Sequence, residues 1–344
     1  MLVSAVLLLV EARVRTDALL LDEDLTLRLS SRELAAPRIG EATIRVAWAG
    51  ICGSDLHVLR TGAWVSYWPA TLGHEVVGVV VACPGDEVRP GTMVVVDSRV
   101  TCGRCSSCVR SAGTCENISW RGESCPGGFA RHLVAPVTSL IACPEDMESA
   151  IAVLAEPLAV AVHAVNNLSV APDDALLVGY GPVGALVHLE LSRRWPQLPV
   201  TVTEPDHERR ALAAAFGAQR SLDGLDALDV SDRFTLVVDG AGFPGSLGRC
   251  CAHAAMGGTV LTVALSFDAE PIVPAVLVER SLTLIGSLGF EHELPEAVEI
   301  LASDPDRYRP LVTEAILLEE APERLAGLLA SPSPGKAVIR PWQE

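Results

Sequence analysis

Short apolar runs separated by turns characterise the first half of the chain, from residue 1 to about 150. The runs at 42–50, 76–83, 92–100 and 129–136 are rich in β-branched residues and are punctuated by Gly, Pro and Asp. Such runs predict short strands, and no long stretch shows the apolar spacing of an amphipathic helix. We therefore predict a compact all-β unit over this half.

The opening MLVSAVLLLV is apolar for ten residues and is followed at once by charged residues. It is too short to span a bilayer and lacks the basic start and the flanking residues of a signal peptide. We interpret it as a first buried strand.

The pattern changes after the helical spacing of residues 154–165. Continuous apolar runs then alternate with helix-like segments, and continuous runs are typical of strands buried on both faces. The alternation predicts a parallel sheet with helices on both sides, from about 151 to 289. A helix-like segment at 294–303 and a strand-like segment at 336–341 follow. The runs that predict strands are 175–179, 199–204, 234–240, 258–264 and 282–287, and the helix-like segments between them include 182–195 and 208–218.

Charge and cysteine content narrow the functional classes. With 26 Lys plus Arg against 43 Asp plus Glu, the net charge is −17, which disfavours nucleic acids and anionic lipid as partners. No stretch reaches the length of a membrane span. Ten cysteines without a secretion signal indicate a reducing compartment, so we expect a cytoplasmic protein whose clustered thiols bind metal.

A glycine-rich segment in the second half has the spacing of a dinucleotide site. Gly179, Gly181 and Gly184 form G-x-G-x-x-G after a buried strand and before a helix, with Pro182 and Val183 between the last two glycines. This arrangement places a pyrophosphate at the helix N-terminus.

Glu204 ends the next predicted strand, twenty residues after the last glycine. A carboxylate there accepts hydrogen bonds from the ribose hydroxyls and repels a 2′-phosphate, so we predict NAD rather than NADP. Arg209 and Arg210 follow closely and weaken the exclusion of NADP, or else line the adenosine edge. The alternative for Glu204 is a solvated strand end.

Four cysteines lie within fourteen residues, in the segment CGRCSSCVRSAGTC. Cys102, Cys105, Cys108 and Cys115 match a closed tetrahedral Zn²⁺ site, which stabilises a fold and leaves no position for substrate. The alternative is a disulfide framework. Cys125 is an alternative fourth ligand.

Three further segments complete a resemblance that runs nearly end to end. They are GICGSDLH at 50–57, GHEVVG at 73–78 and AEPLAVAVHA at 155–164, to which the closing GKAVIRP adds a fourth. The chain resembles the zinc-dependent medium-chain alcohol and polyol dehydrogenases, closest in pattern to the sorbitol, polyol and cyclitol branch. The resemblance implies an α/β protein, with a GroES-like β-rich catalytic domain over 1–150 and 290–344 and a Rossmann doubly wound nucleotide-binding domain over 151–289. The gap before Cys115 is one residue shorter than is usual in the family.

The resemblance also implies a second, catalytic zinc. Cys52, His74 and Glu156 match its ligands, and Glu75 matches a carboxylate that binds or exchanges on the metal. Asp55 matches the carboxylate that orients the histidine ligand. Taken singly, Cys52 could be a buried thiol and His74 a core histidine.

The implied reaction is hydride transfer from an alcohol carbon to the nicotinamide. A thiolate, an imidazole and a carboxylate leave one open position, at which zinc acidifies a bound hydroxyl. Ser54 and His57 match a proton relay to water, although a loop histidine such as His57 is as often only solvated.

The predicted partner is a small polyhydroxylated substrate. The Glu-Pro segment favours the secondary alcohol of a polyol, sugar or (amino)cyclitol, converted to the ketone. Trp64, Tyr67 and Trp68 could face a substrate ring or could pack the loop. Alternatives are a simple-alcohol, threonine-type or aldehyde-active relative, or a binding protein that keeps the fold without turnover. Relatives are dimers or tetramers, so we expect a homodimer or homotetramer.

Overall fold

The computed structural model describes residues 14–110, 115–267, 269 and 271–343, so the apolar opening for which we predict a strand lies outside the described residues. The chain forms two compact units, unit 1 with residues up to 156 and from 298, and unit 2 with residues 157–297. The predicted boundaries at 150/151 and 289/290 lie just ahead of α5 (Ala155–Asn166) and α10 (Leu294–Ser303), whereas the units divide inside these helices. Of the helices in the described residues, none has the length and apolar character to cross a membrane.

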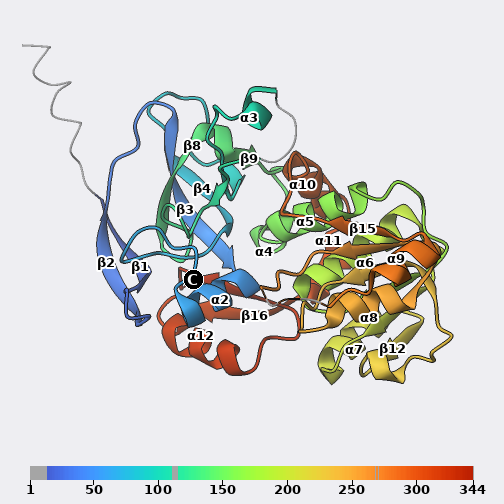
Figure 1. Cartoon of the computed structure of the whole chain (residues 1–344). Helices are drawn as coiled ribbons and strands as arrows, with labels where there is room; N and C mark the ends of the chain where they lie inside the picture. The colour runs from blue at the N-terminus through green and yellow to red at the C-terminus, as the bar shows by residue number, and fades with distance from the viewer. Residues whose placement is uncertain (1–13, 111–114, 268, 270, 344) are drawn as a thin grey trace, which may run out of the picture. The chain divides into compact units, whose positions relative to one another are not determined.

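Unit 1 is built on a largely antiparallel sheet with strand order β16-β17-β3-β4-β5-β9, in which β8 also pairs with β3 (Figure 1). Its apolar side chains form a core. Ile44, Val80 and Leu133 belong to this core and are fully buried. The strands are β1 Val14–Leu21, β2 Leu27–Leu34, β3 Glu41–Gly50, β4 Glu75–Ala82, β5 Met93–Val96, β6 Arg99–Val100, β7 Ser119–Trp120, β8 His132–Pro136, β9 Leu140–Ala142, β16 Val312–Leu317 and β17 Lys336–Arg340. The helices are α2 Gly53–Thr61, α3 Ser106–Arg110, α4 Ser149–Ala152, α11 Pro305–Tyr308 and α12 Ala321–Ala330, with 3-10 turns η2 Val137–Ser139 and η4 Arg309–Leu311.

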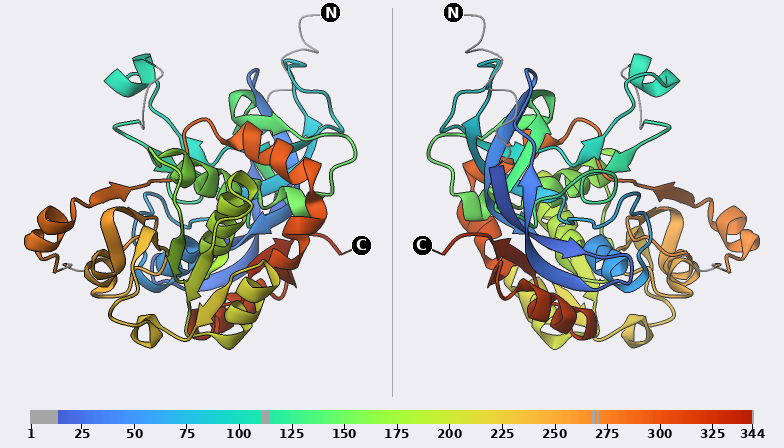
Figure 2. Two further views of the ribbon diagram at one scale, coloured as in Figure 1. Left: turned by 90° about the vertical axis from the view of Figure 1, so that its right-hand side faces the viewer. Right: turned by 90° about the vertical axis from the view of Figure 1, so that its left-hand side faces the viewer.

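An antiparallel hairpin of β1 and β2 lies on this sheet, and the right-hand view of Figure 2 faces it. The amide of Leu19 donates to the carbonyl of Phe129, and the amide of Arg131 donates to the carbonyl of Asp17. The free edge of β1 is thereby hydrogen-bonded to the segment that leads into β8.

Unit 2 has a parallel sheet with strand order β12-β11-β10-β13-β14-β15. This is the order of a doubly wound nucleotide-binding sheet, in which the first strand of each half lies at the centre and ligands bind where the order reverses. That point is between β10 and β13. The strands are β10 Ala175–Val178, β11 Val200–Thr203, β12 Arg220–Leu222, β13 Phe234–Asp239, β14 Ala254–Thr262 and β15 Thr283–Gly286, and the helices are α6 Pro182–Arg194, α7 His207–Ala215, α8 Ser246–His253 and α9 Pro274–Arg280, with a 3-10 turn η3 Leu225–Ala227.

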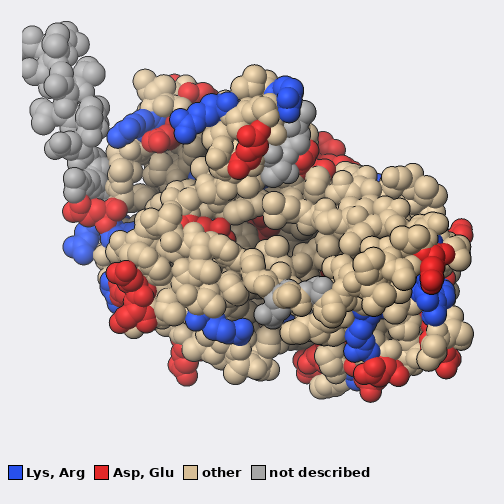
Figure 3. All heavy atoms as spheres, viewed as in Figure 1, with Lys and Arg blue, Asp and Glu red and all other residues tan. Residues whose placement is uncertain are grey.

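The predicted α/β class, with a β-rich domain and a parallel-sheet domain, is confirmed. On the face of the described residues drawn in Figure 3, basic and acidic side chains are interspersed rather than gathered into a basic tract.

Within unit 2, Glu293 fastens the end of α5 to the loop before α10. Its carboxylate contacts His163 Nδ1 at 2.8 Å and accepts hydrogen bonds from the amides of Glu291 and His292. Burial alone would raise the pKa of Glu293, but these hydrogen bonds outweigh it and lower the pKa to about 2.

We expect E293Q to lower the stability of unit 2 at pH 7 by about 1–2 kcal/mol, a value reduced for solvent screening. Because the folded pKa of Glu293 lies below its unfolded value, the stabilisation is present above about pH 4.5 and is lost as the pH falls toward 2. Urea unfolding across this pH range should show the difference between wild type and E293Q shrinking with acidity. A variant of the exposed Glu279, E279Q, is the control, and equal pH profiles for wild type and E293Q would contradict the prediction.

Candidate metal centres and nucleotide site

The register of two strands brings the first candidate ligands together. Gly50, the last residue of β3, pairs with Glu75, the first residue of β4. Cys52 therefore follows one strand just where His74 precedes its neighbour. Ligand atoms of Cys52, His74 and Glu75 lie within 4.8 Å of one another, and we call these three residues the β3–β4 cluster.

Asp55 holds the two ligand-bearing loops in place. It is buried in the first turn of α2, where one carboxylate oxygen accepts from the amide of Cys52 at 2.9 Å and the other from the amide of Gly73 at 3.1 Å. Its Oδ1 also lies 3.7 Å from His74 Nδ1. Burial by itself would lower the pKa of His74, but the negative charge of Asp55 and the side chain of Cys52 raise it well above its ordinary value.

Glu75 is fully buried and paired with Lys336, the only lysine of the chain. The Lys336 ammonium donates to Glu75 Oε1 at 2.5 Å and to the carbonyl of Ile51 at 3.2 Å. The other carboxylate oxygen, Oε2, is buried and has no hydrogen-bond partner in the described residues. A Cβ at Gly50 would overlap this oxygen, so glycine is required where Glu75 approaches β3.

Glu156, at the start of α5, is buried but lies outside the β3–β4 cluster. Ser98, just beyond β5, donates a hydrogen bond from Oγ to Glu156 Oε1 at 2.8 Å. Burial raises the pKa of Glu156 to about 7, Glu75 adds to the rise, and His74, Ser98 and Lys336 oppose it. The electrostatic influence of His74 on Glu156 shows that this carboxyl lies near the cluster.

The donor set fits a divalent metal ion. A thiol, an imidazole and buried carboxylates converge, and an orphaned oxygen such as Glu75 Oε2 is the kind of atom that a cation satisfies. The structure therefore brings together Cys52, His74 and Glu75 in the tightest grouping, with Glu156 beside it.

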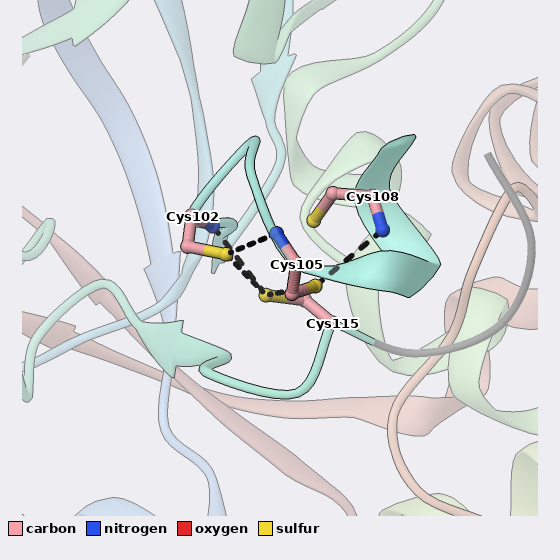
Figure 4. A group of neighbouring side chains, drawn as sticks. All are labelled: Cys102, Cys105, Cys108 and Cys115. Carbon is pink, nitrogen blue, oxygen red and sulfur yellow. Dashed lines mark hydrogen bonds between the residues drawn. The ribbon is translucent and has the colours of Figure 1, made fainter. Parts of the chain in front are cut away.

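The four cysteines of the second candidate centre also converge (Figure 4). The sulfur of Cys115 lies 3.6 Å from that of Cys102 and 3.9 Å from that of Cys105. Thiolates around a tetrahedral Zn²⁺ are separated by about 3.8 Å, given Zn–S bonds of about 2.3 Å. Cys125 is not in this group, and the cysteines of the described residues are all free thiols.

Backbone amides lower the pKa of one of these thiols. The amides of Arg104 and Cys105 donate to the sulfur of Cys102 and lower its pKa to about 6. A thiol that ionises readily is suited to metal ligation, because the thiolate is the ligand.

The helix α2 carries the predicted relay residues Ser54 and His57, and both are half-buried. The ring of His57 lies 4.7 Å from that of Trp64, centroid to centroid. Tyr67 and Trp68 pack against the core of unit 1, and the Tyr67 hydroxyl is hydrogen-bonded to the backbone of Thr71. Of the three loop aromatics, Trp64 is the exposed one.

In unit 2 the glycine loop has the geometry that its spacing predicts. Gly179 follows β10 with φ of +88°, and a Cβ at Gly184 would lie 2.5 Å from the carbonyl oxygen of Gly179. The loop caps α6, which begins at Pro182 with Gly181 as N-cap and Val183 in its first turn. A Cβ at Gly181 would meet nothing nearer than an Arg209 nitrogen at 3.9 Å, so the space in front of this residue is open.

Glu204 is buried beside this loop. One carboxylate oxygen accepts from the amide of Tyr180 at 2.7 Å and the other from the amide of Asp206 at 3.0 Å. Arg209 Nη1 lies 4.0 Å from Glu204, whereas Arg210 donates to the carbonyls of residues 204 and 205. Of the two arginines, Arg209 is therefore the one that faces the glycine loop.

Sequence reasoning missed Ser98 and Lys336 as neighbours of the first centre. Each is far from the cluster along the chain, since Lys336 and Glu75 are 261 residues apart. The signal for Lys336 was available, because a lone lysine at the start of an apolar strand has to bury its charge or find a partner.

Comparison with known proteins gives the following matches. The family model for the alcohol dehydrogenase GroES-like domain matches residues 38–145. A D-altritol 5-dehydrogenase from Agrobacterium fabrum is 32% identical over 292 residues, which cover 82% of this chain and 86% of that protein. A putative zinc-binding dehydrogenase from Sinorhizobium meliloti, bound to NADP, superimposes with a TM-score of 0.87 and 25% identity, over 95% of this chain and 100% of that one. The rspB alcohol dehydrogenase from Escherichia coli CFT073, complexed with NADH, shares the fold with a TM-score of 0.85 and 23% identity, over 95% and 99% of the two chains.

Proposed function

The chain belongs to the zinc-dependent medium-chain alcohol and polyol dehydrogenases, and we propose that it converts a secondary alcohol of a polyol, sugar or (amino)cyclitol to the ketone, with NAD as hydride acceptor. The observation that carries the proposal is the β3–β4 cluster, because it joins a thiol, an imidazole and a carboxylate within 4.8 Å of one another, with Glu156 nearby. The similarity to a D-altritol dehydrogenase supports a polyhydroxylated substrate.

Cys52 and His74 would hold the catalytic zinc with Glu156, while Glu75 binds or exchanges on it. When bound, zinc acidifies a coordinated hydroxyl and NAD accepts hydride. Asp55 keeps the imidazole and the thiol in position through the amides of residues 52 and 73. Ser98 orients Glu156 through its hydroxyl. Ser54 and His57, on the adjoining helix, would pass the alcohol proton toward water.

The four-cysteine group would hold a structural zinc. All four sulfurs are used, so no position remains for substrate. The proposed content is thus two zinc ions per chain.

A panel of polyols, cyclitols, sugars, threonine and simple alcohols, followed by NADH absorbance, tests the proposed function. We expect turnover on polyhydroxylated secondary alcohols and a ketone product. Turnover restricted to simple alcohols, threonine or aldehydes would favour another branch of the family. Absence of turnover on every compound with either nucleotide would favour a binding protein.

We expect the wild-type protein to prefer NAD over NADP by ten- to a hundredfold in kcat/KM. A 2′-phosphate would place its charge against the buried carboxylate of Glu204, at a cost of about 1–3 kcal/mol. E204S should lower the ratio of kcat/KM with NAD to kcat/KM with NADP, since Arg209 can then contact the 2′-phosphate.

The isosteric variant E204Q separates charge from shape, because it keeps the length of the side chain. A wild-type protein that already favours NADP would show that Arg209 sets the preference. The NADP bound to the Sinorhizobium relative makes this measurement decisive for the present chain.

A further inference from the structure

Glu123 lies beside the β3–β4 cluster, and no role has been given to it above. It is half-buried in the turn between β7 and β8. The preceding residue, Gly122, lies against Gly73, which is next to His74, and the pKa of Glu123 responds to the charges of His74 and Asp55. In the described residues its carboxylate has no hydrogen-bond or ion-pair partner.

Backbone packing fixes this position. The amides of Gly127 and Gly128 donate to the carbonyls of Thr71 and Gly73, which precede His74. A Cβ at Gly122 would lie 3.2 Å from the amide nitrogen of Gly73. The residue immediately before Glu123 is therefore in close contact with the strand entry that carries the histidine ligand.

A second tether joins Glu123 to the aromatic loop. The amide and the hydroxyl of Ser66 donate to the carbonyl oxygen of Glu123 at 2.9 and 3.3 Å. Ser66 lies two residues after Trp64, whose exposed ring contacts that of His57. The backbone of Glu123 is thus hydrogen-bonded to the aromatic loop.

In the part of the chain that the structure describes, no cation is paired with this carboxylate. The nearest basic residue in sequence, Arg121, is buried and donates Nη1 to the carbonyl of Pro126 at 3.0 Å. Burial is the main reason that the pKa of Glu123 is raised to about 7, with Asp55 adding to the rise and His74 opposing it. A partly desolvated carboxylate without a partner gains strongly from a donor that brings positive charge.

We propose that Glu123 is a specificity-determining residue that receives a protonated amino group of the substrate, so that the preferred substrate is an amino-substituted polyol or cyclitol. The inference rests on the proposed function and narrows its substrate class. Because Glu123 is partly exposed and adjoins the His74 loop, a ligand whose hydroxyl reaches the cluster can present its amine to this carboxylate.

The experiment compares matched compounds that differ in one amino group. The pairs are D-glucitol with 1-amino-1-deoxy-D-glucitol, scyllo-inositol with scyllo-inosamine, and 3-hydroxybutanoate with L-threonine. We expect wild-type kcat/KM to favour the amino member of the best pair by about ten- to a hundredfold. E123Q should remove this preference and leave kcat/KM for the neutral member within about threefold.

Calorimetric binding of the same pairs to wild type and E123Q gives a readout independent of turnover. The amino compound should bind wild type more tightly than its neutral partner, and E123Q should equalise the two. E123D should restore part of the preference. E145Q, which removes a charge from an exposed carboxylate of the same unit, should leave the preference intact.

Wild-type turnover or binding without any preference for the amino members would overturn the inference and leave the proposed function standing. An equal loss of kcat/KM for the amino and the neutral compound in E123Q would also overturn the inference, since that result indicates a structural role for Glu123. If no compound is turned over, the proposed function fails, and the calorimetric comparison still decides whether Glu123 recognises an amine.

Discussion

C52S is expected to lower kcat/KM by about a thousandfold or more while leaving the fold of unit 1 intact. The cluster is supported by the β3–β4 pairing, the Asp55 hydrogen bonds and the Lys336 ion pair, none of which needs the sulfur. The loss would fall on the acidification of the substrate hydroxyl, which requires a complete ligand set. Steady-state kinetics and circular dichroism on the same preparation measure the two effects.

C105S is expected to lower the stability of the fold while largely preserving turnover. The segment around α3 contributes no buried residue from that helix, so the four-cysteine group is what orders it, and loss of one thiolate should cost several kcal/mol of stability. Turnover per folded molecule should change far less than in C52S.

C125S is the matched control, because Cys125 lies outside the group and its loss should leave the zinc content unchanged. Metal analysis of fresh wild-type protein should return two zinc ions per chain. A content of one or none, or a loss of zinc in C125S, would refute the assignment.

K336M is expected to destabilise unit 1 by about 3–5 kcal/mol, because it leaves the Glu75 carboxylate buried without its cation. Lys336 is 1% exposed and Glu75 is 0% exposed, so water cannot replace the lost partner. Burial would lower the pKa of Lys336, but Glu75 and Cys52 raise it above its ordinary value, which favours the ammonium form of Lys336. Tryptophan fluorescence reports the unfolding of unit 1, which contains Trp48, Trp64, Trp68, Trp120 and Trp342.

The double variant K336M/E75Q tests the cause. Removing both charges should recover most of the stability, whereas each single change leaves one uncompensated group. A free energy of unfolding for K336M that differs from that of wild type by less than about 1 kcal/mol would show that the pair contributes little to stability.

The sequence pattern was most informative where burial is two-sided. The continuous apolar runs of the second half became β10, β11, β13, β14 and β15, and the helix predicted at 294–303 is α10. A residue in such a strand is apolar whichever face it occupies, so the signal does not depend on register. The spacing of the glycines was equally informative, because Gly179 and Gly184 each have a steric reason in the fold.

Short elements and elements that are buried on one face only were harder to predict from the sequence pattern. The β1–β2 hairpin has charged residues along both strands, and α2 buries only two apolar side chains, Val58 and Leu59, over nine residues, so neither rises above loop patterns. The assembly of the first candidate centre was visible only through family resemblance, since Cys52, Glu75 and Lys336 meet through the pairing of β3 with β4 and β17 rather than through local spacing. Glu123 has no sequence signal, because its significance lies in the lack of a hydrogen-bond or ion-pair partner among the described residues.

The burial of the single lysine has a consequence for solution chemistry. Every other basic side chain that carries a permanent charge is an arginine, so reagents that acylate amines find no lysine on the folded surface. Covalent labelling of Lys336 therefore requires β17 to separate from its neighbours, and the labelling rate measures how often this local opening occurs. A ligand that stabilises the end of the sheet around β17 would lower the labelling rate of Lys336 without any change in the number of reactive groups.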